Sequence, residues 1–272
     1  MGNYPVHTSL SGDHGPAASG PTRRRSRVFV VLPAYNEEPN IARLLDRISE
    51  TLEEENLLYM VVVVDDGSKD RTPEILHSYM ERIPLAVARH ENNQGLGATI
   101  RDGLVIAAKQ AGPNDIVVTM DADDTHTPGL ILRMVRMIRE GHDVVIASRY
   151  RSGARIFGLT VWRRFISYAA SWLLRLIFPT PGVRDFTCGY RAYRGSTLHL
   201  AISLYGEEFI NAEGFQCMVD ILLKLRRMKT IFGEVPMILR YDQKSGESKM
   251  RVFRTAANTL RLVARRRLGF LK

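Results

Sequence analysis

The sequence has few cysteines and no long uncharged apolar run. Only Cys188 and Cys217 occur among 272 residues, which is too few for a disulfide framework and favours a reducing compartment. No stretch of 18 or more uncharged apolar residues is present, and the first residues lack the apolar core of a signal peptide. These absences predict a cytoplasmic protein that folds without disulfides and has no membrane-spanning helix.

Glycine-rich phosphate-binding motifs are also missing. A dinucleotide-binding fold needs G-x-G-x-x-G directly after its first strand, where glycine lets the backbone approach a pyrophosphate. Here that position holds Pro33–Glu37, and Gly95-Leu-Gly97 follows a later strand without the third glycine. No G-x-x-x-x-G-K-[ST] loop occurs either. Dinucleotide-dependent oxidoreductases and P-loop enzymes are therefore excluded.

The charge balance is basic. A hydrophobic content of 45% allows one large domain with a full core, and the net charge of +9 indicates anionic partners. Residues 1–26, rich in Gly, Ser and Pro, are predicted to be a disordered basic tail, and residues 251–272 a basic amphipathic tail. In residues 155–178, arginines mix with Trp, Phe and Leu, which favours a membrane surface over nucleic acid as the partner.

Apolar runs alternate with segments of helical periodicity between these tails. Strands are predicted at Val28–Leu32, Met60–Val64, Pro84–Ala88, Ile116–Met120, Asp143–Ser148 and Glu234–Leu239, and helices at Pro39–Leu58, Asp70–Arg82 and Gly95–Gln110. Continuous Val and Ile runs between helices are typical of a parallel sheet that is covered on both faces. Residues 27–250 are thus predicted to form an α/β domain with a mostly parallel, nucleotide-binding sheet flanked by helices.

Three acidic loops follow predicted strands. They are Pro33–Glu38, Asp65–Asp70 and Asp121–Asp123, and ligands bind beyond the carboxyl ends of strands in such sheets. The side chains of Asp121 and Asp123, at i and i+2, share a face of an extended segment, so both carboxylates can reach one hard cation. A cap on the following helix is the alternative for Asp65 or Asp70. Together the loops predict a site for a metal ion and a diphosphate.

Five ordered motifs carry a family resemblance. They are Val31-Leu-Pro-Ala-Tyr-Asn-Glu37, Val64-Asp-Asp-Gly-Ser68, Asn92-Asn-Gln-Gly-Leu-Gly97, Asp121-Ala-Asp123 and Ala147-Ser-Arg-Tyr150. From Val28 to about Arg251 the chain resembles family 2 glycosyltransferases, and within them the dolichyl-phosphate (polyprenyl-phosphate) mannosyltransferase branch. The resemblance implies a GT-A fold with acceptor and membrane-facing elements toward the C-terminus. It also implies inverting, metal-dependent transfer of one sugar from a nucleotide sugar to a polyprenyl phosphate lipid at the cytoplasmic membrane face, with mannose and GDP-mannose favoured.

The resemblance also implies which residues bind the donor. Those for the nucleotide sugar are Pro33, Tyr35, Glu37, Val63, Asp65, Asp121, Ala122, Asp123, Arg149 and Lys249. Asp121 and Asp123 would hold Mg²⁺ or Mn²⁺. Relatives carry a Gln two positions later, where this chain has Thr125 followed by His126, so the third ligand stays open between these two and neither. Many relatives also have a basic residue where Gln243 stands, so the cation that closes on the diphosphate is open.

The acceptor phosphate is assigned in the same way to Arg149, Arg163 and Ser167. Asp185 and Arg191 would lie on the acceptor side, with a structural salt bridge as the alternative for Asp185. No general base is assigned, because a phosphate nucleophile is already deprotonated near neutral pH. Residues 155–178 are predicted to be an interfacial helix, with packing on the catalytic domain as the alternative, and Tyr241–Met250 a loop over the donor.

Other readings of the motifs remain open at this stage. A family 2 enzyme could use UDP-glucose or a UDP-N-acetylhexosamine, or a glycolipid or polysaccharide acceptor. A non-catalytic nucleotide-sugar-binding homologue is a further alternative, which the intact Asp121 and Asp123 disfavour. Peripheral association with a membrane surface is expected, no nucleic-acid partner is expected, and the motifs indicate no protein partner.

Overall fold

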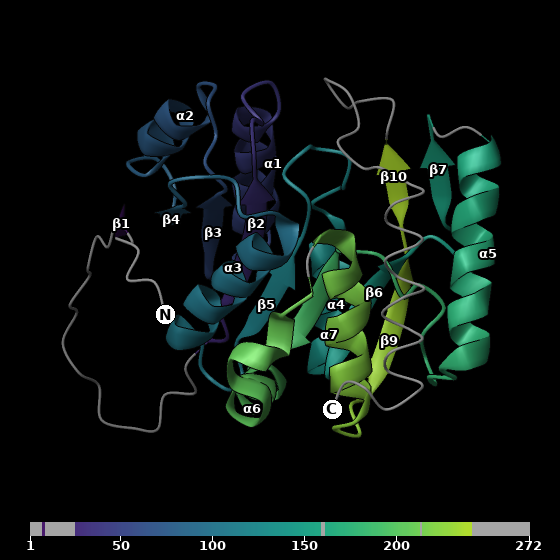
Figure 1. Cartoon of the computed structure of the whole chain (residues 1–272). Helices are drawn as coiled ribbons and strands as arrows, with labels where there is room; N and C mark the ends of the chain where they lie inside the picture. Colours follow the sequence, from purple (N-terminus) through teal and green to yellow (C-terminus); the bar gives the residue numbers. More distant parts are fainter. Residues whose placement is uncertain (1–6, 9–24, 159–160, 213, 241–272) are drawn as a thin grey trace, which may run out of the picture.

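The computed structural model describes residues 7–8, 25–158, 161–212 and 214–240, where strands and helices alternate as the apolar pattern predicts (Figure 1). The strands are β1 (His7–Thr8), β2 (Val28–Ala34), β3 (Tyr59–Asp65), β4 (Leu85–Arg89), β5 (Ile116–Thr119), β6 (Val144–Ser148), β7 (Arg155–Phe157), β8 (Arg191–Arg194), β9 (Phe232–Pro236) and β10 (Ile238–Arg240). The α-helices are α1 (Ile41–Glu54), α2 (Thr72–Tyr79), α3 (Leu96–Gln110), α4 (Leu130–Arg139), α5 (Val161–Ile177), α6 (Gly195–Tyr205) and α7 (Cys217–Arg226). Two short 3₁₀ helices, Gly206–Ile210 and Gly214–Gln216, join α6 to α7.

Eight strands form one sheet in the order β1-β4-β3-β2-β5-β8-β6-β9. Strands β4, β3, β2 and β5 are parallel, and so are β6 and β9, but β8 runs antiparallel to both of its neighbours. Val28–Leu32 and Val61–Val64 are fully buried, as expected for strands that are covered on both faces. The predicted mostly parallel α/β sheet is confirmed.

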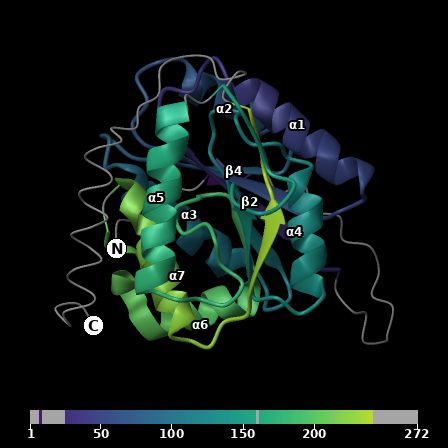
Figure 2. The same ribbon diagram turned by 90° about the vertical axis from the view of Figure 1, so that its right-hand side faces the viewer.

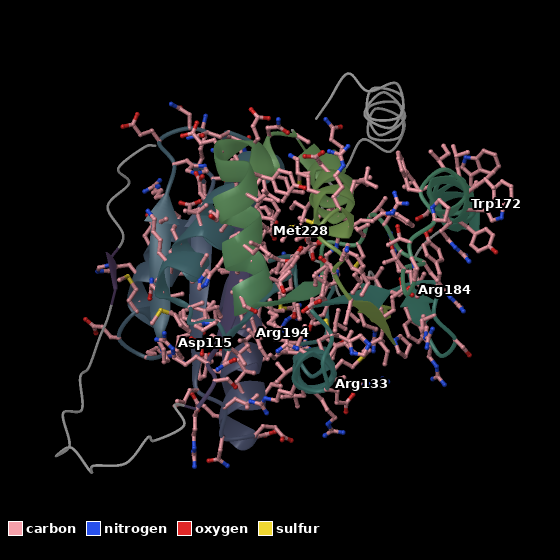
Figure 3. All side chains as sticks on the ribbon, turned by 90° about the horizontal axis from the view of Figure 1, so that it is seen from below. Asp115, Arg133, Trp172, Arg184, Arg194 and Met228 are labelled. Carbon is pink, nitrogen blue, oxygen red and sulfur yellow. The ribbon has the colours of Figure 1, made fainter. Side chains whose placement is uncertain are left out.

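Helices cover both faces of this sheet. In Figures 2 and 3, α1 and α4 lie on one side of it and α3 and α7 on the other. Gly103 of α3 lies so near the side chains of Val31 and Val64 that a Cβ at this position would collide with them. The glycine therefore lets α3 pack closely on β2 and β3 and fixes where the loops at their carboxyl ends lie.

Several predicted boundaries differ from the structure. His7–Thr8, within the tail predicted to be disordered, pair with β4 as a short antiparallel strand. The predicted interfacial helix at 155–178 begins only at Val161, because Arg155–Phe157 form β7 and pair with β10. The predicted strand Glu234–Leu239 divides into β9 and β10.

Other expectations fall outside the described residues. These are Lys249, Gln243, the Tyr241–Met250 loop and the 251–272 tail. Within the described ranges, no helix has the length and apolar character needed to cross a membrane.

Candidate active site

The loops after β2 and β3 are joined to each other at one edge of the sheet. These strands and β5 are parallel, so their carboxyl ends meet at the same edge (Figure 1). The Asn36 N–H donates to Ser68 Oγ at 2.9 Å, and Asn36 Oδ1 accepts from the Lys69 N–H at 2.8 Å. Asp70 accepts from the N–H groups of Glu38 and Thr72, so it caps the start of α2 as well as tying the loops together. The two loops therefore form one rigid rim.

Asp121 and Asp123 lie directly beyond β5 at this edge. The side chain of Asp121 is 39% exposed, Asp123 is partly exposed, and Ala122 between them is buried. Both carboxylates are thus accessible at the place where the sequence predicted a metal site. Gly189 lies beside them, since a Cβ at that position would be 3.4 Å from Asp121 Oδ1. The absence of a side chain at residue 189 leaves room next to the carboxylate.

Thr125 and His126 both contact these aspartates. The hydroxyl of Thr125 donates to Asp123 Oδ1 at 2.7 Å, and its N–H donates to the same oxygen. His126 Nδ1 accepts the Asp121 N–H at 3.2 Å, and its Nε2 lies 3.7 Å from Asp121 Oδ2. Nδ1 is thus occupied by the main chain of Asp121, and Nε2 faces the carboxylate of the same residue. The geometry favours orientation of the aspartates by both residues over direct ligation.

Asp124 ties the same loop to helix α1. It is 1% exposed, has a φ of 57°, and accepts from Arg43 Nε and Arg47 Nη1 of α1 at 2.6 Å each. Each carboxylate oxygen therefore has its own guanidinium partner. We did not predict this contact from the sequence. Its only signal was the spacing of the two arginines, which places them on one face of α1.

The donor set fits a divalent ion that is bound together with a ligand. Carboxylate oxygens are preferred by Mg²⁺ and Mn²⁺. In the part of the chain that the structure describes, no three His, Cys, Asp or Glu side chains are grouped to hold a metal. Asp121 and Asp123 would therefore supply two ligands, and the oxygens of a diphosphate and water would complete the coordination.

Asp65, which was predicted to contact the base of the nucleotide, is a buried carboxylate at the same edge. It is 1% exposed, and its Oδ1 accepts from the Ser68 N–H at 3.0 Å. Oδ2 lies 3.2 Å from Arg89 Nε, yet among the described residues it has no hydrogen bond of good geometry. This buried acceptor can therefore receive a ring N–H. Strand β2 lies between the strands that lead to Asp65 and Asp121, so two strand spacings of about 5 Å each separate these two acids.

Four other predicted donor residues have different surroundings. Pro33, near the end of β2, and Tyr35, just beyond it, are partly exposed. Glu37 is nearly buried, and its Oε2 accepts from Asn40 Nδ2 at 2.9 Å, so it supports the start of α1. Val63 is completely buried in the core. Its side chain has no surface for a ligand, which corrects the base contact expected for this residue.

A second cluster centres on Arg149, which follows β6. Its Nε and Nη2 donate to Asp185 at 2.8 and 2.7 Å, and Nη2 also donates to Thr187 Oγ1 at 2.6 Å. Burial opposes ionisation of Asp185, but the Arg149 charge and the hydrogen bonds outweigh it and lower the pKa of the carboxyl. Burial likewise opposes the Arg149 charge, yet Asp185 raises the pKa of the guanidinium well above its ordinary value. Asp185 therefore forms a salt bridge with a charged arginine, which is the alternative given for it in the sequence analysis.

Tyr150 connects Arg149 to Ser167, another residue predicted to bind the acceptor. Its hydroxyl is 2.7 Å from Ser167 Oγ, and the Arg149 guanidinium carbon lies 5.5 Å from the centre of its ring. Burial raises the pKa of the Tyr150 phenol, so it stays neutral. Arg163 precedes Ser167 by one turn of α5, and its side chain lies outside the described part. The contribution of Tyr150 was not predicted.

Arg191 is not on the acceptor side as expected. Its side chain is completely buried and donates to the main-chain carbonyls of Phe186, Cys188 and Met218 at 2.7 to 2.8 Å. It therefore fixes the Asp185–Tyr190 loop from the inside and has no surface for a lipid.

The same fold occurs in a solved sugar transferase. The crystal structure of glucosyl-3-phosphoglycerate synthase from Mycobacterium tuberculosis, in complex with Mn²⁺, uridine diphosphate and glucosyl-3-phosphoglycerate, superposes with a TM-score of 0.64. The two are 22% identical, and the match covers 90% of this chain and 80% of that chain. The fold is thus that of the GT-A glycosyltransferases.

Sequence comparison identifies the family. Residues 29–199 match the family described as Glycosyl transferase family 2, and the chain belongs to it. It is 33% identical over 226 residues to the dolichol-phosphate mannosyltransferase of Pyrococcus furiosus, a match that covers 83% of this chain but only 59% of that relative. It is 32% identical over 228 residues to the undecaprenyl-phosphate mannosyltransferase of Micrococcus luteus, covering 82% and 87% respectively. The protein is therefore a glycosyltransferase, which confirms the family resemblance of the motifs.

Proposed function

We propose that this glycosyltransferase moves one mannosyl residue, with inversion, from a nucleotide sugar to a polyprenyl phosphate at a membrane surface. GDP-mannose is the favoured donor. The observation that carries the proposal is the Asp185–Tyr190 loop, which contacts both clusters. Asp185 holds Arg149, and four residues later Gly189 lies against Asp121. Four residues span at most about 14 Å, so the two clusters are close enough to serve one transfer.

The donor half of the site follows from the aspartates. A divalent metal bound here would neutralise the charge that builds on the departing nucleoside diphosphate. Asp121 and Asp123 hold that position, and Thr125 and His126 keep the carboxylates oriented. The buried oxygen of Asp65 would accept from the base. Each of these groups is fixed before substrate binds, which lowers the cost of reorganisation during the reaction.

The acceptor half follows from the arginine. Asp185 and Thr187 occupy Nε and Nη2 of Arg149, and Nη1 has no hydrogen bond within the described residues. Nη1 can therefore donate to a lipid phosphate, together with the Ser167 hydroxyl at the start of α5. A phosphate monoester is largely a dianion at neutral pH, so no protein group has to remove a proton before attack.

Helix α5 is the proposed contact with the membrane. It exposes large apolar side chains, at 65% for Trp162, 55% for Tyr168, 56% for Trp172 and 64% for Leu176. Aromatic and aliphatic side chains beside arginines are typical of a helix that lies in the headgroup region. Peripheral association would bring the lipid phosphate to Ser167. The cytoplasmic face of the membrane stays a prediction from the family resemblance.

The test is a transfer assay with Mg²⁺ or Mn²⁺, undecaprenyl or dolichyl phosphate, and GDP-mannose, UDP-glucose and UDP-N-acetylglucosamine in parallel. Mannosyl transfer from GDP-mannose is expected. Asp123→Ala should lower turnover about a hundredfold or more at every metal concentration, since a metal ligand is lost. Glu50→Ala, which removes an exposed acid of α1, should leave turnover unchanged. The proposal fails if no donor glycosylates either lipid, or if Asp123→Ala retains full activity.

A further inference from the structure

A surface pocket of about 570 Å³ lies between the C-terminal half of α5 and the segment that follows this helix. We call it the basic pocket, because Arg151, Arg175 and Arg184 line it. The other lining residues are Trp172, Leu176, Pro179, Thr180, Pro181, Gly182 and Val183. Its lining includes none of Arg149, Tyr150, Ser167, Asp185 and Thr187, although Arg151 and Arg184 adjoin Tyr150 and Asp185 in the chain. Arg175 is eight residues beyond Ser167 on α5, which corresponds to about 12 Å along the helix.

Within the described residues, the three arginines have no acidic partner. All three residues are exposed, and within the described residues none of their guanidiniums forms a hydrogen bond or an ion pair. None of the described lining residues is acidic. By contrast, Arg43, Arg47 and Arg149 each bind a carboxylate. Three guanidiniums without partners around one hollow make a strongly positive site, and their planar N–H groups fit the oxygens of a phosphate.

The rim of the pocket is apolar on its outer side. Trp172 is 56% exposed and Leu176 is 64% exposed, one turn apart on α5. Figure 3 shows Trp172 and Arg184 together at the edge of the molecule that α5 forms. A tryptophan prefers the boundary between headgroups and acyl chains, where arginines keep their charge at the phosphate level. The basic pocket and its rim therefore match both parts of a charged lipid.

We propose that the basic pocket binds the headgroup phosphate of an anionic phospholipid, with Trp172 and Leu176 at the level where the acyl chains begin. This site is additional to the one for the lipid that accepts the sugar. It would set the depth and rotation of α5 on the membrane, and hence the direction from which an acceptor reaches Ser167. It requires neither a nucleotide sugar nor a polyprenyl phosphate.

The test is sedimentation of the full chain with vesicles of phosphatidylcholine, with or without phosphatidylglycerol, and without polyprenyl phosphate. Two arginines near an anionic surface account for about a thirtyfold difference in affinity. Arg175→Gln with Arg184→Gln should therefore weaken binding to the anionic vesicles by about thirtyfold. The matched control is Arg133→Gln with Arg136→Gln, which removes the same charge from exposed positions on α4 (Figure 3). An equal loss in both pairs, or none in either, overturns the proposal.

A second arm separates a lipid headgroup from a soluble anion. Inorganic phosphate is titrated against the wild type and the Arg175→Gln, Arg184→Gln variant by calorimetry. If phosphate binds the wild type tightly while anionic vesicles do not distinguish the two proteins, the lipid assignment is wrong. Melting curves of both variants confirm that they are folded. Because no sugar transfer is measured, failure of this proposal leaves the proposed function untouched, and the reverse also holds.

Discussion

Breaking the contact between Asp124 and α1 should cost more stability when the arginines are removed than when the carboxylate charge is removed. Asp124 is 1% exposed, whereas its partners Arg43 and Arg47 are 52% and 33% exposed. Two perturbations break the same pair of ion pairs: Asp124→Asn removes the carboxylate charge, and Arg43→Ala with Arg47→Ala removes both guanidiniums. They differ in which charge is left behind, and in whether that charge can reach water.

The magnitudes follow from that difference. Without the arginines, a buried carboxylate remains unpaired, which costs about 3 to 5 kcal/mol. In Asp124→Asn the charge disappears, the amide can still accept, and both arginines can turn toward solvent. The free energy of unfolding should therefore fall by only about 1 to 2 kcal/mol, since partly exposed ion pairs are screened. Asparagine also tolerates the φ of 57° at this position, so no backbone strain is added.

Urea unfolding of the wild type, of Asp124→Asn and of the Arg43→Ala, Arg47→Ala double variant measures how much unfolding free energy each variant loses. Arg133→Ala with Arg136→Ala, on the exposed face of α4, controls for the loss of two charges and should change stability by less than about 1 kcal/mol. Equal costs for the two perturbations, or a larger cost for Asp124→Asn, would refute the reasoning. Because Asp124 adjoins Asp123, the double arginine variant should also need more metal for half-maximal activity, whereas the α4 control should not.

Two further predictions concern Thr125 and Glu234. Thr125→Val removes the hydroxyl that donates to Asp123, and the lost hydrogen bond of about 1 kcal/mol should lower kcat/KM about fivefold. Thr125→Ser keeps a hydroxyl and should restore kcat/KM. Equal activities of the two variants would contradict this role. Burial raises the pKa of Glu234 above 4.5, so the folded state binds the proton more tightly than the unfolded one. Its contribution to stability is therefore present at low pH and is lost as the pH rises through the raised pKa. The unfolding free energy of wild type minus that of Glu234→Gln should fall with pH across this window, and a constant difference would rule the effect out.

The fold could be predicted where apolar runs are continuous. Val28–Leu32 and Met60–Val64 are such runs, and both are strands at the centre of the sheet. Strand β8 could not be recognised, because its sequence Arg-Ala-Tyr-Arg begins and ends with charged residues. Arg191 is buried there only because carbonyls from α7 and the preceding loop receive its guanidinium. Partners of that kind come from tertiary structure and leave no local pattern.

The candidate site could be predicted in part for a similar reason. Asp121 and Asp123 stand beyond a strand, and the geometry of parallel sheets brings such residues to one edge. Arg43 and Arg47 lie on an amphipathic helix, where charged residues usually face solvent, so their shared face alone did not predict a contact with Asp124. Val63 is the opposite case, because its assignment came from the family resemblance, whereas its side chain lies in the core.

The reversed direction of β8 has a consequence for how the two substrates are kept apart. Since β8 lies between β5 and β6 and runs against both, the Asp185–Tyr190 loop enters the sheet at the edge where those strands end. Under the proposed function, the loop would separate the diphosphate on one side from the lipid phosphate on the other. Its length sets the gap that a sugar must cross. An insertion in this loop would change the spacing of donor and acceptor without altering any group that binds either one.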